Sequence, residues 1–503
     1  MMQYPSLPNH RLRSGNSSRI DSSQDNQPQV FDDLQGWTAI GSLILVTVIC
    51  IAVGAGKVLN ILFPTWSFVV GIILYFRHPI LYNGFVWWMW FMVAFVRRLS
   101  DFRSGYTEPS PILLAPYLVS FVSSITLFKR LGKTQEDRSL LFILPLYATL
   151  YGLIIGLLLR PSFLALRGFL DWSSPLFMAF HLFVNWRLYP QYRRNTQKVF
   201  LWGVLIMSIY AVRQFLDLPE WDLLWLKESG MESASGSAEE GGVRVWGTMH
   251  SVEPFTAVIS GGLLILLSCM GGLGLPASII GSLVLLICRV RATWIGWIFG
   301  LLSFIGALKT KNQLQLMVIA VILIACLVPL VVLPEFSDVI GSRFDTLNDV
   351  SNDYSASVRQ ESFNTLIGPA LTSFIGEGLG PGSMDNAILS TLFYIGWVGT
   401  VPYVAGLTIA LAKMFQTPTN SRDLFATVSR GVVMSAVVRI PFNGSHLGPS
   451  GSLMWCFMAL ALAAERYRIY EENTKAIQEL DYLRQLEADS DHHESFSSPH
   501  WSN

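Results

Sequence analysis

Residues 139–159 read SLLFILPLYATLYGLIIGLLL, an apolar run that contains no charged side chain. A helix needs about 20 such residues to cross the hydrocarbon core of a bilayer. Lipid offers the backbone no hydrogen-bond partner, so a segment that crosses the core has to be helical. This stretch therefore predicts a membrane-spanning α-helix.

Similar apolar blocks recur on both sides of this run, from Trp37 to Ala464. Hydrophobic residues make up 51% of the chain and charged residues 14%, whereas an ordinary soluble domain is roughly 25% charged. The predicted fold class is an all-α polytopic membrane protein of about 14 spans, with about 12 as the lower bound. The predicted spans are 37–56, 59–76, 80–96, 111–128, 139–159, 168–186, 198–213, 252–270, 273–288, 292–308, 314–333, 386–411, 424–438 and 450–464.

The lysines and arginines between the spans predict the orientation, because short cytoplasmic loops are enriched in both residues. With this span count, both chain ends and the most basic short loops fall on the cytoplasmic side. Those loops contain Lys129, Arg130, Lys133 and Arg138; Arg187, Arg193, Arg194 and Lys198; Lys309 and Lys311; and Lys413 and Arg422. One loop does not fit this orientation, because the span count places Arg97, Arg98 and Arg103 on the extracytoplasmic side. Either a span near the start is misplaced, which is the explanation favoured here, or these arginines serve the outer face.

Outside the spans, the chain divides into two terminal segments and two long loops. Residues 1–36 are expected to form a disordered cytoplasmic tail, and residues 465–503 a cytoplasmic amphipathic helix followed by a disordered tail. The transmembrane domain covers 37–464. Its two long extracytoplasmic loops lie near 214–250 and 334–385.

Loops longer than about 15 residues are usually functional or disordered. In the first long loop, the low-complexity stretch ESASGSAEEGG at 232–242 predicts a flexible insert. In the second, Ser355 can cap a helix that lies on the outer membrane surface. That predicted helix carries Val358, Arg359, Phe363 and Leu366 at amphipathic spacing.

Polar groups are costly near a membrane, so the few charges at span boundaries are candidates for function. Residues 244–254 read RVWGTMHSVEP and place a cation, an imidazole and a carboxylate at the start of a span: Arg244, His250 and Glu253. The alternative is an interfacial cap, because arginine and tryptophan are common at membrane boundaries.

Arg289 and Arg291 enter at the outer ends of two adjacent spans, with almost no loop between them. Lysine and arginine are usually enriched on the cytoplasmic side, so two arginines on the outer side predict a ligand that compensates their charge. A phosphate would suit both side chains, since guanidinium binds phosphate oxygens in bidentate fashion. The alternative is that both side chains snorkel to lipid head groups.

The second long loop adds Arg343 and Arg359, and it ends in GEGLGPGSMDN at 376–386. Its glycines predict a turn whose backbone passes close to a substrate; no buried strand precedes them, which argues against a nucleotide loop. Asp385 lies where the next span begins, so partial desolvation would make it a stronger base. The alternative is that Asp385 only caps the span.

Taken in order, these segments resemble the bacterial O-antigen ligase and O-antigen polymerase superfamily. The resemblance rests on RxxGT followed by a proline at 244–254, on Arg291-Ala-Thr-Trp294, on the long loop with two arginines, on GxGLG and on Gly396-Trp-Val-Gly399. It covers roughly residues 200–415, and each motif alone is loose. Ligases of the superfamily commonly have His-Asn where this chain has Asp385-Asn386, and an Asp-Asn pair looks more like the polymerase branch.

The resemblance implies a GT-C-like, metal-independent glycosyltransferase without a cofactor, located in the bacterial inner membrane. Arg291, Arg343 and Arg359 would bind the donor diphosphate, where fixed cations stabilise the departing group. Asp385 or His250 would assist the acceptor hydroxyl. The further substrate-binding residues would be Arg244, Arg289, Glu253 and Asn386.

The expected function is a polysaccharide polymerase, which transfers glycan from a polyprenyl diphosphate to the terminal sugar of another lipid-linked repeat unit at the outer face. The alternatives are O-antigen ligase-type transfer to lipid A core or another acceptor, and transport of small anions. A transporter should have polar groups near the midplane and repeated halves, whereas here they gather at the outer boundary.

The partners of such a polymerase would be the polyprenyl-diphosphate-linked oligosaccharide and membrane lipids. A chain-length regulator and a flippase are further candidates. The formal net charge is zero, which gives no indication of a nucleic-acid partner.

Overall fold

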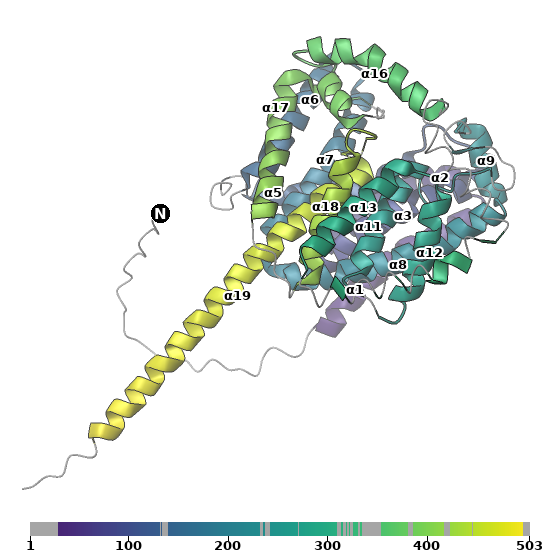
Figure 1. The fold of residues 1–503 in the computed structure, drawn as a ribbon. Helices are drawn as coiled ribbons and strands as arrows, with labels where there is room; N and C mark the ends of the chain where they lie inside the picture. Colours follow the sequence, from purple (N-terminus) through teal and green to yellow (C-terminus); the bar gives the residue numbers. More distant parts are fainter. Residues whose placement is uncertain are drawn as a thin grey trace, which may run out of the picture.

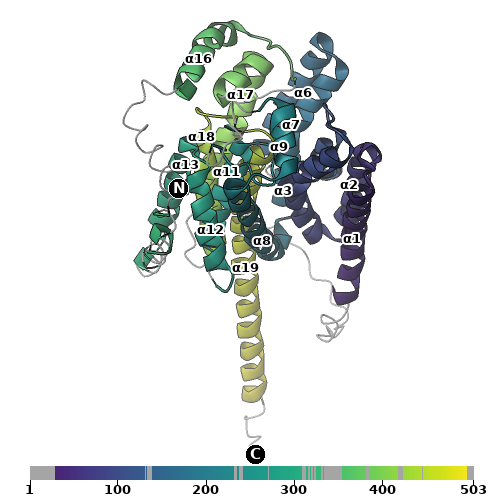
Figure 2. The same ribbon diagram turned by 90° about the vertical axis from the view of Figure 1, so that its right-hand side faces the viewer.

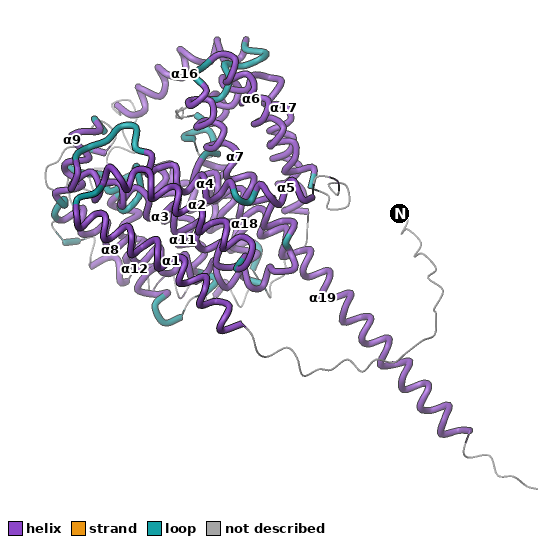
Figure 3. The backbone as a smooth tube through the Cα atoms, turned by 180° about the vertical axis from the view of Figure 1, so that it is seen from behind, coloured by secondary structure: helices purple, strands orange, loops and turns teal. Residues whose placement is uncertain are grey.

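The computed structural model describes residues 29–130, 132, 139–231, 235–236, 242–269, 271–308, 313–314, 318, 321, 325–329, 332–333, 354–380, 386–416, 423–444 and 446–495. Every regular element in these ranges is a helix, as Figures 1 and 3 show. The all-α class is therefore confirmed for the described part of the chain. Apolar segments of this kind form helices in a bilayer because each satisfies its own backbone hydrogen bonds.

The α-helices are α1 (Gln29–Val53), α2 (Gly56–Arg77), α3 (Pro79–Ser104), α4 (Ala115–Phe121), α5 (Ser124–Arg130), α6 (Leu140–Leu159), α7 (Ser162–Val184), α8 (Tyr189–Leu216), α9 (Glu220–Ser229), α11 (Val252–Leu266), α12 (Gly274–Ile287), α13 (Arg291–Gly306), α16 (Tyr354–Thr372), α17 (Ala387–Gln416), α18 (Leu424–Arg439) and α19 (Gly448–Ser495). Two 3₁₀ turns, Pro111–Leu114 and Trp186–Leu188, precede α4 and α8.

Seven helical segments in the described part of the chain are long and apolar enough to cross a membrane. They are Leu34–Val53, Gly56–Arg77, Pro79–Ser104, Pro111–Arg130, Leu140–Leu159, Trp186–Leu216 and Ala387–Gln416. The apolar helices α11, α12 and α13 are shorter, at 15, 14 and 16 residues. A membrane protein is thus supported by length and composition, whereas the total of about 14 spans stays a prediction. The predicted span 314–333 lies largely outside the described residues.

The helices run between two ends of the bundle, which we name the basic end and the loop end. At the basic end, the Arg187 guanidinium lies 5.9 Å from the centre of the Tyr470 ring, and Arg193 lies 3.6 Å from Asp423. The loop end carries α9 and α16. Figures 1 and 2 show the beginning of α1 and the protruding half of α19 on the side of the basic end, and α16 on the opposite side.

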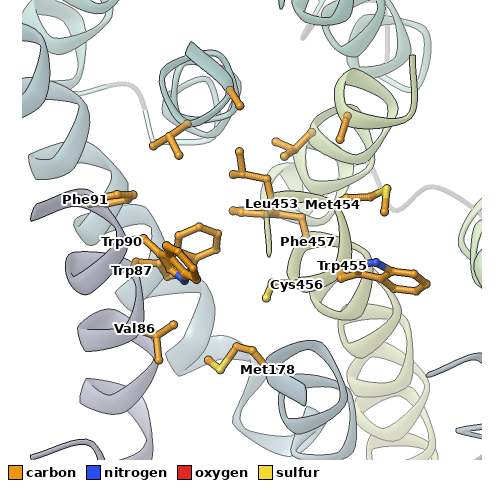
Figure 4. Packing of buried hydrophobic residues seen from close by; sticks show 14 of the residues in the cluster. Val86, Trp87, Trp90, Phe91, Met178, Leu453, Met454, Trp455, Cys456 and Phe457 are labelled. Atoms are coloured by element: carbon orange, nitrogen blue, oxygen red, sulfur yellow. The ribbon is translucent and has the colours of Figure 1, made fainter. Parts of the chain in front are cut away.

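Aromatic side chains of α3, α8 and α19 fill the centre of the bundle. The ring centres of Trp87 and Phe200 are 4.9 Å apart, and those of Phe200 and Phe457 are 5.6 Å apart. Figure 4 shows Trp87 and Phe91 on α3 with Leu453 and Phe457 on α19 across the cluster. Such rings bury much apolar surface, so they fix the relative position of the three helices.

The predicted span at 450–464 and the predicted helix after it form one continuous helix, α19. Residues 450–464 are buried, and beyond Tyr470 the helix is mostly exposed. No glycine or proline interrupts 452–495, so nothing in the sequence ends the helix where it leaves the bundle.

The first long loop contains α9, which packs on α3 and precedes the stretch 232–242 that was predicted to be flexible. Most of the predicted flexible insert lies outside the described residues, although Ser235 is fully buried and its carbonyl accepts the Arg244 N–H at 2.7 Å. The buried Arg98 of α3 contacts the backbone of Gly247 and Met249 in this loop. Arg97 and Arg98 therefore lie at the loop end, beside the first long loop, and the side of the membrane that they face stays a prediction.

The glycine-rich stretch of the second long loop packs against helices. The sequence predicted instead that this stretch passes close to a substrate. A Cβ on Gly378 would lie 2.3 Å from the Gly156 nitrogen of α6. A Cβ on Gly376 would lie 2.5 Å from the Gly396 nitrogen of α17. The Leu379 N–H donates to the Gly152 carbonyl at 2.9 Å, so these glycines are needed for backbone-to-backbone packing.

The predicted helix in the second long loop is confirmed as α16, which begins at Tyr354, so Ser355 lies in its first turn. Its carboxyl end is joined to α17 at a kink, where Gly396 adopts a φ of 58°. The kink directs the N–H groups of Trp397 and Val398 to the carbonyls of Ser373 and Phe374, at 3.4 and 3.2 Å. The Gly396-Trp-Val-Gly399 motif therefore anchors this loop.

Candidate functional site

The backbone at 246–249, inside the RxxGT segment, is fixed by Arg98. The guanidinium donates to the carbonyls of Gly247 at 2.6 Å and Met249 at 2.7 Å, and it forms an ion pair of 2.6 Å with Asp222 of α9. Arg98 is 1% exposed and Asp222 is fully buried. A buried charge is tolerated only when it is paired and hydrogen-bonded, and here both conditions are met.

Asp222 and Gln214 extend this network to the other side of the segment. Asp222 also accepts hydrogen bonds from Tyr210 at 2.6 Å and from the Gln214 amide at 2.7 Å. The Gln214 side-chain oxygen in turn accepts the N–H groups of Trp246 and Gly247, both at 3.0 Å. The segment that leads to His250 and Glu253 is thus held by side chains from three helices.

A second buried arginine, Arg97, holds the chain that leaves α3. It donates to Asp101 at 3.1 Å, to the Thr107 carbonyl at 2.9 Å and to the Glu108 carboxylate at 2.6 Å. Partial burial alone would raise the pKa of Glu108, but the hydrogen bond and charge of Arg97 outweigh it and lower that pKa. Glu108 is therefore an ionised carboxylate at neutral pH.

Glu253, on the first turn of α11, is the centre of a polar cluster at the loop end. Its carboxylate accepts hydrogen bonds from the Asn443 amide at 3.0 Å and the Ser450 hydroxyl at 3.3 Å. Arg439, at the end of α18, is 1% exposed and lies 3.7 Å from the same carboxylate. We name Glu253, Arg439, Asn443 and Ser450 the Glu253 cluster.

Several buried polar atoms around the Glu253 cluster have no hydrogen-bond partner among the described residues. They are Arg439 Nη1, Asn443 Oδ1 and both ring nitrogens of His446. His446 is 2% exposed and packs edge-on against Trp172, with ring centres 4.6 Å apart. Unpaired polar atoms are rare in protein interiors, and when clustered they indicate a place for water or a ligand.

Two other predicted site residues, Arg291 and Asn386, lie at the starts of helices beside this cluster. Arg291 is the first residue of α13, and Thr293 in the same turn lies 3.1 Å from the Thr256 hydroxyl of α11. Asn386 precedes α17, where its side-chain oxygen accepts the N–H groups of Ile388 at 2.9 Å and Leu389 at 3.1 Å. Asn386 is thus the N-cap of α17, a role that the sequence offered for Asp385.

Arg244 and Arg289 form a separate pair, farther along the loop end. Arg289 donates to the Gly242 carbonyl at 3.0 Å and has a left-handed φ of 59°, which is uncommon for a residue with a side chain. Partial burial and, to a smaller extent, the positive charge of Arg244 lower the pKa of Arg289. The structure therefore brings together two of the predicted cations.

His250 borders a cavity between α3, α7 and the turns before α11 and α19. Its ring is exposed toward this space and lies edge-on to Trp225, with ring centres 5.6 Å apart. The enclosing protein and the charges of Arg97, Arg98 and Arg167 lower the pKa of His250. The imidazole is therefore neutral at physiological pH and can accept a proton.

The remaining predicted residues cannot be placed at the cluster. Asp385 and Arg343 lie outside the described residues, and Arg359 belongs to α16, but its side chain is not described. Within the described part of the chain, no group of three His, Cys, Asp or Glu side chains could hold a metal ion.

The sequence analysis missed the turn between α18 and α19, residues 439–450, which reads RIPFNGSHLGPS. Its signal is an arginine, an asparagine and a histidine placed between two apolar spans, where polar groups are costly. It also missed Gln214 and Asp222, which look like ordinary loop residues until α9 brings them against α3. No protein-family model matches this chain, and no curated protein sequence matches it significantly.

Proposed function

We propose that this protein is a polysaccharide polymerase, a glycosyltransferase that works at the outer face of the inner membrane and transfers glycan from a polyprenyl diphosphate to the terminal sugar of another lipid-linked repeat unit. The observation that carries the proposal is the Glu253 cluster. In this cluster the buried Arg439 faces the half-buried carboxylate of Glu253, and unpaired polar atoms lie nearby, at the end of the bundle where α13 begins with Arg291.

The reaction requires cations for the departing diphosphate and a weak base for the attacking hydroxyl. Fixed guanidinium groups stabilise negative charge as it develops on the diphosphate, and they bind its oxygens in pairs. Arg291, Arg289 and Arg244 are the cations of the loop end proposed for this role, with Arg343 and Arg359 of the second long loop.

The acceptor hydroxyl needs a group that takes its proton as the new glycosidic bond forms. His250 is proposed because its ring lines the neighbouring cavity and is unprotonated at physiological pH; its lowered pKa makes it a weak base. Asp385 is the second candidate from the sequence. Glu253, with its carboxylate already bonded to Asn443 and Ser450, is proposed to orient substrate, because its lone pairs are partly occupied.

The proposal is tested by replacing Arg291 with Ala in cells that make the polymer, and analysing the lipid-linked glycans by mass spectrometry. Arg213→Ala is the matched control, since Arg213 lies at the end of α8 and is 55% exposed in a surface ion pair with Asp217. We expect Arg291→Ala to cause accumulation of single unpolymerised repeats at normal protein level, and Arg213→Ala to leave the polymer unchanged.

Two other outcomes are informative. Full-length polymer that accumulates on the lipid carrier would instead identify a ligase. Normal polymer in Arg291→Ala, and also in Arg289→Ala and Arg244→Ala, would reject the transferase proposal.

A further inference from the structure

A cavity of about 240 Å³ opens beside the candidate site, between α3, α7 and the turns that precede α4, α11 and α19. The side chains that decide its chemistry are Trp90, Glu108, Ser110, Tyr117, Arg167 and His250. Pockets for drug-sized ligands are roughly 300–1,000 Å³, so this one has room for a single ring-sized group.

Two residues that line this cavity each carry a buried polar atom with no partner among the described residues: the Trp90 indole nitrogen and the Ser110 hydroxyl. Trp90 is 5% exposed and Ser110 is 6% exposed, so bulk water does not satisfy them. A buried donor without a partner costs free energy, and a ligand with hydroxyl groups would remove that cost.

The walls of the cavity are rigid and partly aromatic. The ring of Trp90 meets the ring of Tyr117 edge-on, with centres 4.8 Å apart, and the Tyr117 hydroxyl donates to Asp171 of α7 at 2.8 Å. Prolines at 109, 111, 116, 254 and 449 line the remaining walls, and their fixed φ angles keep these turns stiff. A stiff pocket loses little entropy when it binds a ligand.

The charges around the cavity favour an uncharged ligand. The Glu108 carboxylate is offset by the guanidinium of Arg97, 2.6 Å away. Arg167 adds a positive charge at the edge, and the His250 ring is neutral. An anion would meet the Glu108 carboxylate, and a cation would meet Arg167, so neither is well matched.

We propose that this cavity binds one neutral sugar ring. A pyranose has an apolar face that packs on an indole, and its hydroxyl edge both donates and accepts hydrogen bonds. The Trp90 N–H and the Ser110 hydroxyl bind that edge, with the Glu108 carboxylate as an acceptor. The assignment of the ring to the acceptor end of a glycan rests on the proposed function, whereas sugar binding itself does not.

The position of the cavity fits this role. His250 lines the cavity, and Pro254 and Pro449, which also line it, adjoin Glu253 and Ser450 of the Glu253 cluster in sequence. A sugar held in the cavity therefore lies next to the proposed proton acceptor, and the donor group lies on the neighbouring side of the first turn of α11.

The test is direct binding to the purified full chain in lipid nanodiscs, measured by saturation-transfer NMR. The probes are the methyl glycosides of glucose, rhamnose and N-acetylglucosamine. We expect saturation of at least one probe, and binding about three- to tenfold weaker in Trp90→Phe and in Ser110→Ala, because each variant deletes one hydrogen bond; Ser110→Ala keeps the shape of the wall, whereas Trp90→Phe also removes part of the ring. Trp202→Phe, at an exposed tryptophan of α8, is the control and should bind normally.

The outcomes separate this inference from the proposed function. If none of the three probes is saturated, or if the Trp90→Phe and Ser110→Ala variants bind as wild type does, the cavity is not a sugar site. If the probes bind in the expected way while Arg291→Ala, Arg289→Ala and Arg244→Ala all make normal polymer, sugar binding stands and the transferase proposal falls. If polymer fails as expected but no probe binds, only the cavity inference falls.

Discussion

Arg98 organises the part of the loop end that lies between α9 and the turn before α11. One guanidinium binds two backbone carbonyls of the RxxGT segment and the carboxylate of Asp222. The sequence identifies Arg98 only as a positive charge on the unexpected side of the membrane. Its partners come from α9 and from the turn before α11, so their proximity depends on the packing of helices far apart in sequence.

Replacing Arg98 with Ala should destabilise the protein by about 3–5 kcal/mol, because the Asp222 carboxylate would be left buried and without its cation. The measurement is the thermal unfolding of the detergent-solubilised protein. The comparison is Arg213→Ala, which removes an exposed pair worth at most about 1 kcal/mol. Equal unfolding temperatures for the two variants would show that the buried pair does not hold this end together.

At the scale of elements, the helices themselves follow from the sequence, but the way they approach one another does not. The glycines at 376, 378 and 380 predict a close approach, and the sequence alone does not say to what. The structure supplies the partners, Gly396 of α17, Gly156 of α6 and Gly168 of α7. The second long loop is thereby anchored to three helices, which fixes where α16 lies.

Gly378→Ala should detach this loop from α6. The added methyl group would lie 2.3 Å from the Gly156 nitrogen, and Gly378 has a φ of 71°, which an alanine adopts with strain. We expect a loss of about 1–3 kcal/mol in stability and faster proteolysis near residue 378. Gly368→Ala is the control, since nothing lies within 4 Å of a Cβ there. Unchanged proteolysis in Gly378→Ala would contradict this packing.

At the scale of the whole molecule, the basic end and the loop end differ in their arginines. Arg187, Arg193 and the protruding half of α19 lie at the basic end, whereas the buried Arg97, Arg98 and Arg439 lie at the loop end. A protein that acts on lipid-linked glycans at the outer face needs the loop end outside, and the basic end then faces the cytoplasm as the loop charges predict.

Cysteine labelling in intact cells tests this orientation. Arg213→Cys at the loop end and Glu472→Cys at the basic end place thiols at exposed positions, with side chains 55% and 61% exposed. We expect a membrane-impermeant maleimide to label Arg213→Cys in intact cells, and Glu472→Cys only after permeabilisation, with the unmodified protein as the blank. The reverse pattern would place the candidate site in the cytoplasm and exclude glycan transfer at the outer face.

The sequence by itself predicts an α-helical chain whose helices are long and apolar enough to cross a membrane, because a long apolar run such as 139–159 has only one way to satisfy its backbone in lipid. It also marks Glu253, His250 and Arg291 as polar residues at span boundaries. Only the tertiary structure decides that Glu253 meets Arg439, that Asp222 meets Arg98 and that Trp90 borders a cavity. Each of these contacts joins helices distant in sequence, and their packing is set by side chains that local periodicity does not encode.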